Sequence, residues 1–249
     1  MNEIIRVENL EVGYEGEAVL KDLNFSVQPG EITVILGKSG CGKTTILKTL
    51  IGLVPPYVGQ VYFSGEQVDY SSESSLENLF RRIGVLYQGG ALLNSFTLFE
   101  NVSLPLRMHY PGLPKEIEQE MVYAKLSQVG LLESRDKYPA ELSGGMRKRA
   151  ALARAMIGDP EIVFCDEPSA GLDPITAREL DSLMLNLKDN FGITFLVVTH
   201  ELRSIEAIAN KALVLNDGGL LFFGDYGDMA GLNDSFIDSF FLKKQGRKS

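Results

Sequence analysis

The chain has 249 residues, 45% of them hydrophobic, which is enough for one large domain or two small lobes with a sizeable core. Its net charge of −9 and sequence pI of about 4.9 argue against nucleic-acid partners, whose binding needs a basic stripe. No apolar run reaches the roughly 18 residues that span a bilayer, the first residues lack a signal-peptide pattern, and two cysteines make no disulfide framework, so a reduced, cytoplasmic setting is expected.

The first predicted elements are strands. Residues 4–14 and 19–27 alternate loosely between apolar and polar side chains, as strands with one solvated face do. Together with residues 59–65 they predict a small antiparallel sheet. Tyr14 lies in this sheet, and its ring is a candidate to stack on a flat ligand ring; packing against strand neighbours is the alternative.

The next segment fits the phosphate-binding loop G-x-x-x-x-G-K-[S/T] at every fixed position. An apolar, β-branched run at residues 32–36 precedes it and predicts a buried strand, while a helical pattern follows up to Leu50. Glycines let the backbone wrap around phosphate oxygens, and the helix N-terminus adds unsatisfied N–H donors. Lys43 is expected to reach the β- and γ-phosphates of a nucleotide, and the Thr44 hydroxyl to bind Mg²⁺. The loop consists of Gly37, Lys38, Ser39, Gly40, Cys41, Gly42, Lys43, Thr44 and Thr45.

A short apolar run at residues 83–87 predicts a second buried strand, which ends at Gln88. From the junction of a strand and a loop, the side-chain oxygen of Gln88 can reach a metal ion or a water molecule. A purely structural glutamine is the alternative.

The region from residue 91 to residue 158 has helical patterns and no predicted strand, so it is expected to form a helical lobe inserted into an α/β core. Pro105 is expected to limit the first helix, and residues 110–114 form a linker. Residues 115–129 predict an amphipathic helix. Its expected inward side chains are Ile117, Met121, Val122, Leu126 and Val129.

Ser143 is a good N-cap for a helix that runs through Ala155. Gly144 and Gly145 follow it, although glycine is a poor helix former. They make sense where bare backbone must approach a group closely, such as a phosphate at the helix N-terminus. The charged residues 147–149 are interpreted as an ordinary solvated helix face.

Residues 161–167 form another apolar run that ends in Asp166 and Glu167. In a protein with a phosphate loop, a carboxylate at such a strand tip is expected to hold the Mg²⁺ shell, which is the role assigned to Asp166. Glu167 is a candidate to take a proton from an attacking water molecule. A strand followed by an acidic loop is the structural alternative.

Asp173 is expected to cap a further helix, whose predicted buried stripe includes Leu180, Leu183, Met184, Leu187 and Phe191. Residues 193–199 predict a third core strand, with His200 at its carboxyl end, the edge at which open α/β sheets bind ligands. A structural histidine is the alternative. A hairpin at 212–223 precedes a short helical tail.

The order of these motifs resembles the ATP-binding-cassette (ABC) ATPases over about residues 3–225. The matching segments are Tyr14, the phosphate loop (Walker A), Gln88, the signature at 142–146, the Walker B strand at 162–167 with the following 169–173, and His200. The resemblance implies an α/β fold with a RecA-like phosphate-loop core, an antiparallel β subdomain and an inserted α-helical subdomain. The implied division is 1–90 with 159–225 for the core and its β subdomain, 91–158 for the helical subdomain and 226–249 for a helical tail.

Family membership implies a mechanism as well. Two copies pair head to tail, and each ATP with Mg²⁺ lies between the Walker A loop of one copy and Ser143, Gly144 and Gly145 of the other. Lys43, Glu167 and His200 are the implied catalytic residues, and Thr44, Gln88 and Asp166 the implied metal ligands. Gln88 is also implied to transmit the nucleotide state to a membrane partner.

One residue departs from the usual signature, because Met146 stands where most family members have glutamine. With the basic residues that follow it, this signature resembles that of the ATPases of Mla-type phospholipid transporters. Residues 87–92 and 99–107 are similar to the same group. The implied partners are a membrane permease and a substrate-binding protein with an Mce domain, and the implied location is the cytoplasmic face of a bacterial inner membrane.

Two alternatives stay open. One is the ATPase of a transporter for another substrate, and the other is a soluble ABC ATPase that acts in iron–sulfur assembly, which predicts no permease. In some relatives the C-terminal tail clasps the neighbouring ATPase; here residues 234–242, with Phe236, Ile237, Phe240 and Phe241, could do so or pack on their own domain.

Overall fold

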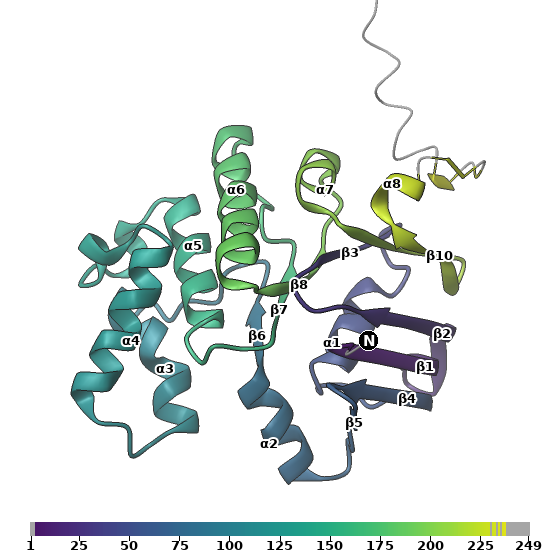
Figure 1. Ribbon diagram of the computed structural model, residues 1–249, viewed down its shortest axis with the longest axis horizontal. Helices are drawn as coiled ribbons and strands as arrows, with labels where there is room; N and C mark the ends of the chain where they lie inside the picture. Colours follow the sequence, from purple (N-terminus) through teal and green to yellow (C-terminus); the bar gives the residue numbers. More distant parts are fainter. Residues whose placement is uncertain (1–2, 230, 233, 235, 238–249) are drawn as a thin grey trace, which may run out of the picture.

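The computed structural model describes residues 3–229, 231–232, 234 and 236–237. These residues form two sheets with helices packed around them (Figure 1). The fold is α/β with a mostly parallel sheet, as the sequence predicts. Among the helices described, none has both the length and the apolar character needed to cross a membrane.

The larger sheet has six strands in the order β10-β9-β3-β8-β7-β6. All neighbours are parallel except β10, which returns antiparallel to β9 and forms the predicted hairpin. Its central strands are apolar and buried on both faces, as expected where helices cover a parallel sheet. The strands are β3 (Ile32–Gly37), β6 (Ile83–Leu86), β7 (Ile162–Asp166), β8 (Thr194–Val198), β9 (Lys211–Asn216) and β10 (Gly219–Asp225).

The smaller sheet is antiparallel, in the order β2-β1-β4-β5, which confirms the sheet predicted from the first strands. Alternate side chains of β1 and β2 are buried beneath it, since only one face of this sheet is covered. The strands are β1 (Ile5–Tyr14), β2 (Glu17–Val27), β4 (Val58–Phe63) and β5 (Glu66–Gln67).

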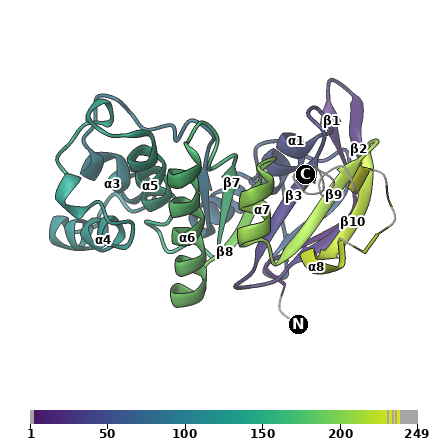
Figure 2. The same cartoon turned by 90° about the horizontal axis from the view of Figure 1, so that it is seen from above.

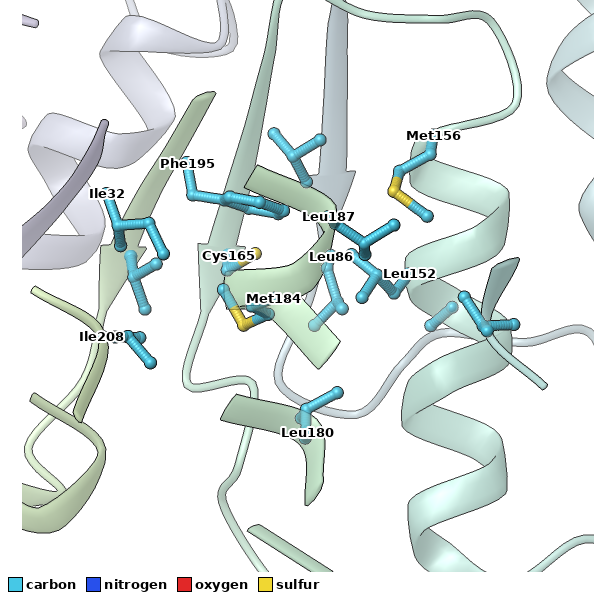
Figure 3. Packing of buried hydrophobic residues seen from close by; sticks show 14 of the residues in the cluster. Ile32, Leu86, Leu152, Met156, Cys165, Leu180, Met184, Leu187, Phe195 and Ile208 are labelled. Carbon is cyan, nitrogen blue, oxygen red and sulfur yellow. The ribbon is translucent and has the colours of Figure 1, made fainter. Parts of the chain in front are cut away.

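The helices divide between the two faces of the larger sheet. Helix α1 packs on one face, in a cluster with the antiparallel sheet, while α5, α6 and α7 pack on the other (Figure 2). Alternate residues of β7 therefore enter different clusters: Phe164 faces α1, and Cys165 faces α6 beside Met184 and Leu187 (Figure 3). The helices are α1 (Lys43–Leu50), α2 (Glu73–Arg82), α3 (Leu98–His109), α4 (Lys115–Gln128), α5 (Gly144–Ala155), α6 (Pro174–Phe191), α7 (Leu202–Ile208) and α8 (Tyr226–Met229), with short 3₁₀ turns at Leu132–Ser134 and Pro139–Glu141.

Helices α3, α4 and α5 gather on the side of the molecule away from the antiparallel sheet (Figures 1 and 2). The loop that leads into α3 is held by the fully buried Asn101, whose Nδ2 donates to the carbonyls of Leu93, Phe96 and Thr97 at 3.0–3.1 Å. The N–H of Leu93 donates to Asn101 Oδ1 at 2.7 Å. Thr97 and Glu100 close a capping box at the start of α3.

Two details of these helices differ from the predictions. Pro105 does not limit the helix, because α3 continues to His109. A proline inside a helix costs about 3 kcal/mol, and here the helix is held by buried side chains on both sides of it, Leu98 and Val102 before the proline and Leu106 after it.

The prediction for the inward face of α4 is also partly wrong, since Ile117 is 48% exposed. Glu118 occupies the inward position in the first turn and pairs with Arg107 of α3 at 2.6 Å. From Glu118, Val122 and Leu126 follow at the four-residue spacing of one helix face. Phe191 likewise is 57% exposed, so the buried stripe of α6 ends with Leu187, one turn before the helix ends.

The described part of the tail packs on its own domain. Ile237 is 1% exposed and belongs to the cluster that contains Ile205 and Ile208 of α7. The ring of Phe236 lies 5.1 Å from Lys38 Nζ. Phe240 and Phe241 are the other two aromatic residues considered for contact with a neighbouring subunit. They lie outside the described residues.

Candidate nucleotide-binding site

Four adjacent strands of the large sheet deliver predicted site residues to one edge. The phosphate loop follows β3, His200 comes after β8, Asp166 and Glu167 close β7, and Gln88 comes after β6. Because these strands are parallel, their carboxyl ends meet at the same edge, where open α/β sheets bind ligands.

A cleft of about 670 Å³ opens at this edge. Tyr14 from β1 and Val19 from β2 close its far side, so the antiparallel sheet contributes to the same cavity. Its lining consists of Tyr14, Val19, Gly37, Ser39, Gly40, Gly42, Lys43, Thr44, Thr45, Gln88, Asp166, Glu167, Val198 and His200. Among the predicted site residues, Lys38, Cys41, Ser143, Gly144 and Gly145 are not part of this lining.

The phosphate loop has the backbone that its glycines allow. Gly40 and Gly42 have φ angles of +81° and +102°, which side-chain-bearing residues rarely adopt. A Cβ on Gly42 would also lie 2.7 Å from Leu20 Cγ, so this position requires glycine for two reasons. Lys43 Nζ donates to the carbonyls of Gly37 and Lys38, both at 2.8 Å, which holds the ammonium across the loop.

Tyr14 stands at the rim of the cleft with 43% of its surface exposed. Lys48 Nζ lies 5.9 Å from the centre of its ring. The ring is therefore available to a ligand on the cleft side, which favours stacking over the alternative of packing within the strand.

Glu167 and His200 form the polar centre of the cleft. His200 Nδ1 and Glu167 Oε1 lie 2.7 Å apart, within hydrogen-bonding distance. The Glu167 side chain is 14% exposed, whereas that of His200 is 70% exposed. Glu167 has a φ angle of +49°, a conformation that costs energy in a residue with a side chain and that concentrates at functional sites.

The cleft residues fit a magnesium ion. The Thr44 hydroxyl, the Gln88 amide and the Asp166 carboxylate offer oxygen donors, which Mg²⁺ prefers. Burial and the adjacent Glu167 raise the pKa of Asp166, against the effect of nearby lysines, so a bound cation would stabilise its ionised form. Among the described residues, no group of three or more His, Cys, Asp or Glu side chains is placed to hold a metal ion.

The signature segment lies at the start of α5. Ser143 caps the helix as predicted, because its Oγ accepts from the N–H of Met146 at 3.2 Å, and the side chain stays exposed. Gly145 has a reason within the chain for lacking a side chain, since a Cβ there would lie 2.3 Å from Thr176 Cγ2 of α6. Asp173 caps α6 by accepting from the N–H groups of Ile175 and Thr176.

The interpretation of residues 147–149 as a solvated face is wrong for Lys148. Only 6% of this residue is exposed, and its Nζ donates to the carbonyls of Gln88 and, at 3.2 Å, Glu167. Lys148 lies one turn before the apolar Ala151 and Leu152, both fully buried, but this spacing does not show whether another segment covers the lysine itself.

A mostly parallel sheet with a phosphate loop at its carboxyl edge defines a nucleotide-binding protein of the phosphate-loop class. The model of the ABC transporter family matches residues 20–170, more than half of the chain. The chain therefore belongs to the ABC transporter family and carries the ATPase cassette of that family.

Curated relatives have several transport roles. The intermembrane phospholipid transport system ATP-binding protein MlaF of Escherichia coli is 39% identical over 83% of this chain and 76% of its own length. The methionine import ATP-binding protein MetN of Carboxydothermus hydrogenoformans is 38% identical, and the probable ribonucleotide transport ATP-binding protein mkl of Mycobacterium tuberculosis is 38% identical. The matches cover 86% and 88% of this chain but only 64% and 61% of those two proteins.

Solved structures have the same fold over nearly the whole chain. CbiO1 of Clostridium perfringens, part of the ABC transporter complex CbiONQ, aligns with a TM-score of 0.85 at 27% identity, covering 98% of this chain and all of the other. The cassette MJ0796, a dimer in a post-hydrolysis state bound to ADP and phosphate, aligns with a TM-score of 0.78 at 29% identity, covering 89% of this chain and 98% of the other.

Proposed function

We propose that this chain is the ATP-hydrolysing subunit of an ABC transporter, which binds ATP with Mg²⁺, dimerises on ATP and powers an integral membrane permease. The observation that carries this proposal is the cleft in which Tyr14, Lys43, Gln88, Glu167 and His200 meet, although they come from five separate parts of the sequence. The core is assigned to residues 1–90 and 159–225, the helical subdomain to 91–158 and the tail to 226–249.

In this proposal the nucleotide lies along the cleft with its adenine against Tyr14 and its phosphates in the loop. The loop N–H groups and the N-terminus of α1 would bind phosphate oxygens. Lys43, already directed across the loop by two carbonyls, would exchange these for the β- and γ-phosphates. A charged hydrogen bond of this kind contributes about 1.5–3 kcal/mol, so Lys43 should matter mainly for affinity.

Thr44, Gln88 and Asp166 would hold the magnesium ion, which neutralises phosphate charge when it is bound. Glu167 would accept a proton from the attacking water, since its carboxylate lies in the cleft and is largely shielded from solvent. His200 would bind the γ-phosphate while its Nδ1 stays at hydrogen-bonding distance from Glu167 and so fixes the direction of both side chains.

The second half of the site would come from another copy of the chain. Ser143, Gly144 and Gly145 do not line the cleft of their own chain, yet Ser143 is exposed at the N-terminus of α5. A homodimer with two-fold symmetry would bring this helix end to the γ-phosphate of the partner's ATP. The dimeric cassette MJ0796 supports this arrangement.

The variant Glu167→Gln tests the central proposal, because it removes the proton acceptor while conserving size. With ATP and Mg²⁺ it should accumulate as a dimer in light scattering and release phosphate slowly. The same variant carrying Ser143→Arg should stay monomeric. A Glu167→Gln protein that hydrolyses ATP at the wild-type rate would refute the catalytic assignment.

The proposed cargo is phospholipid moved between inner and outer membranes, with the subunit at the cytoplasmic face of the inner membrane. The similarity to MlaF supports this cargo, as does the signature Leu-Ser-Gly-Gly-Met. A substrate-binding protein with an Mce domain would complete the assembly, and no nucleic acid would take part. Methionine import is the competing cargo, favoured by the similarity to MetN.

Reconstitution of the chain with its co-purifying permease separates these cargoes. ATP-dependent movement of labelled phospholipid between vesicle populations supports the lipid proposal, and Lys43→Ala serves as the inactive control. Movement of methionine or another small solute alone would replace it. An active ATPase that purifies with no permease would favour a soluble role such as iron–sulfur assembly.

A further inference from the structure

Lys148 is a buried cation on α5, at the back of the nucleotide cleft. Its Nζ donates to the carbonyl of Gln88 and to the carbonyl of Glu167, the latter at 3.2 Å. These residues follow adjacent strands, β6 and β7, and both side chains line the cleft. One ammonium therefore fixes the main chain beneath two separate site residues.

A second cation of α5 acts on the same loop. Arg154 donates to the carbonyls of Gly90 and Ala91, both at 2.7 Å. The loop from residue 88 to residue 91 is therefore attached to α5 at both ends, whereas Glu167 is attached to α5 through Lys148. Of these two cations, Lys148 is therefore the one that links the loop after β6 to Glu167.

Stability alone does not explain a lysine at this position. Burial removes the hydration of the ammonium and lowers the pKa of Lys148, against the opposing effect of the nearby carboxylates of Glu167 and Asp166. Methionine has a similar length and would fill the space without that cost, but it would leave both carbonyls without this donor. The lysine is the side chain of this length that supplies two hydrogen bonds in different directions.

We propose that Lys148 is a positioning residue for ATP hydrolysis, which sets the main chain of Glu167 and Gln88 so that both side chains face the γ-phosphate. This inference rests on the proposed roles of Glu167 and Gln88. Gly144, in the signature segment, lies one helical turn before Lys148 on α5. A shift of the signature end against the partner's ATP therefore moves the donor that holds Glu167 in the chain's own site.

The test compares the full-length variants Lys148→Met, Lys148→Arg and Arg149→Met in steady-state ATPase kinetics. Lys148→Met should lower kcat about ten- to a hundredfold, the effect expected of a displaced catalytic group, while the KM for ATP changes less than about threefold. Lys148→Arg keeps two donors and should recover most of kcat. Arg149 is the matched control, since it lies on the same helix but donates to the carbonyl of Val129 at 3.1 Å, away from the cleft.

A purely structural role predicts a different pattern. Equal losses of kcat and of the unfolding midpoint in Lys148→Met and Arg149→Met would overturn the proposal, as would a Lys148→Arg variant no faster than Lys148→Met. Should Lys148→Met not fold, Lys148→Gln keeps an uncharged NH2 donor on a shorter side chain and should show an intermediate kcat. A kcat of Lys148→Gln equal to that of the wild type would then overturn it.

The double variant Lys148→Met/Glu167→Gln shows whether Lys148 acts through Glu167. Its rate should lie much closer to that of Glu167→Gln than to the product of the two single losses, because glutamine at position 167 accepts no proton wherever it is placed, and a small further loss reports on Gln88. A further loss of the full Lys148→Met factor would exclude this route. Failure of the proposed function looks different: the wild type would not hydrolyse ATP, or Glu167→Gln would keep full activity whatever residue stands at 148.

Discussion

The carboxyl edge of the large sheet and the helices α3–α5 are built by different physical rules. At the sheet edge, the site residues of β6, β7 and β8 lie within two residues of a strand end, so their distance along the sequence from that end fixes their place. In α3–α5, the burial of a side chain depends on which distant segment packs against it. Lys148 is buried because the loops after β6 and β7 lie against its helix, and nothing within α5 alone requires this.

The largest expected effect is a loss of catalytic rate when Glu167, at the carboxyl edge of the large sheet, is substituted. Glu167→Gln should lower kcat by about 10²- to 10⁴-fold, the usual contribution of a general base, and should leave ATP binding intact. Phosphate release and equilibrium binding of a fluorescent ATP analogue measure the two quantities. Normal turnover would show that another group accepts the proton.

The next effect tests the corrected face of α4. Leu126 is fully buried, and Leu126→Ala should lower the free energy of unfolding by about 2–5 kcal/mol. Ile117→Ala on the same helix is the control; since Ile117 is 48% exposed, its effect should stay within about 0.5 kcal/mol. If both variants lost the same free energy of unfolding in urea, the face of α4 predicted from the sequence would be correct after all.

At the sheet edge, Lys43→Ala should weaken ATP binding about ten- to a hundredfold, because one charged hydrogen-bond donor to the phosphates is lost. The unfolding midpoint without nucleotide should change little, since in the part of the chain that the structure describes Lys43 Nζ donates to two loop carbonyls. Calorimetric titration with ATP and Mg²⁺ gives the affinity, and unchanged binding would remove Lys43 from the site.

The smallest effect probes the junction of α5 and α6. Gly145→Ala adds a Cβ 2.3 Å from Thr176 Cγ2, which should cost about 1–3 kcal/mol, less about 0.5–1 kcal/mol gained from alanine in a helix. Thr176→Ser removes that methyl group and keeps the hydroxyl that donates to Asp173. Gly145→Ala should therefore lose its destabilising effect in the Thr176→Ser background, and an equal cost in both backgrounds would exclude this clash.

This difference between the two regions explains which features could be predicted from the sequence. The strand order could not be predicted, but the phosphate loop, the ends of β6, β7 and β8, and the caps Ser143 and Asp173 follow from local patterns that the structure confirms. The cleft gathers the predicted residues, while their chemical roles stay predictions. Sequence failed where packing overrides local preference, as for a proline within α3.

The burial of Lys148 and the exposure of Ile117 and Phe191 could not be predicted for the same reason, because they depend on packing. A lysine in a charged run resembles a surface residue, and an apolar residue in the first or last turn of a helix resembles a core residue. Each assignment depends on whether a neighbouring segment reaches that turn, which helical spacing does not record.

The buried amide of Asn101 has a consequence for the surface above it. Its Nδ2 and Oδ1 atoms make four hydrogen bonds to the loop that leads into α3, so these bonds hold the loop in one conformation before any partner binds. Leu93 projects from it with 41% of its surface exposed. Binding of a protein to this loop would cost little conformational entropy, because the loop is already ordered. The rate of association would then be set by diffusional encounter and not by rearrangement of the loop.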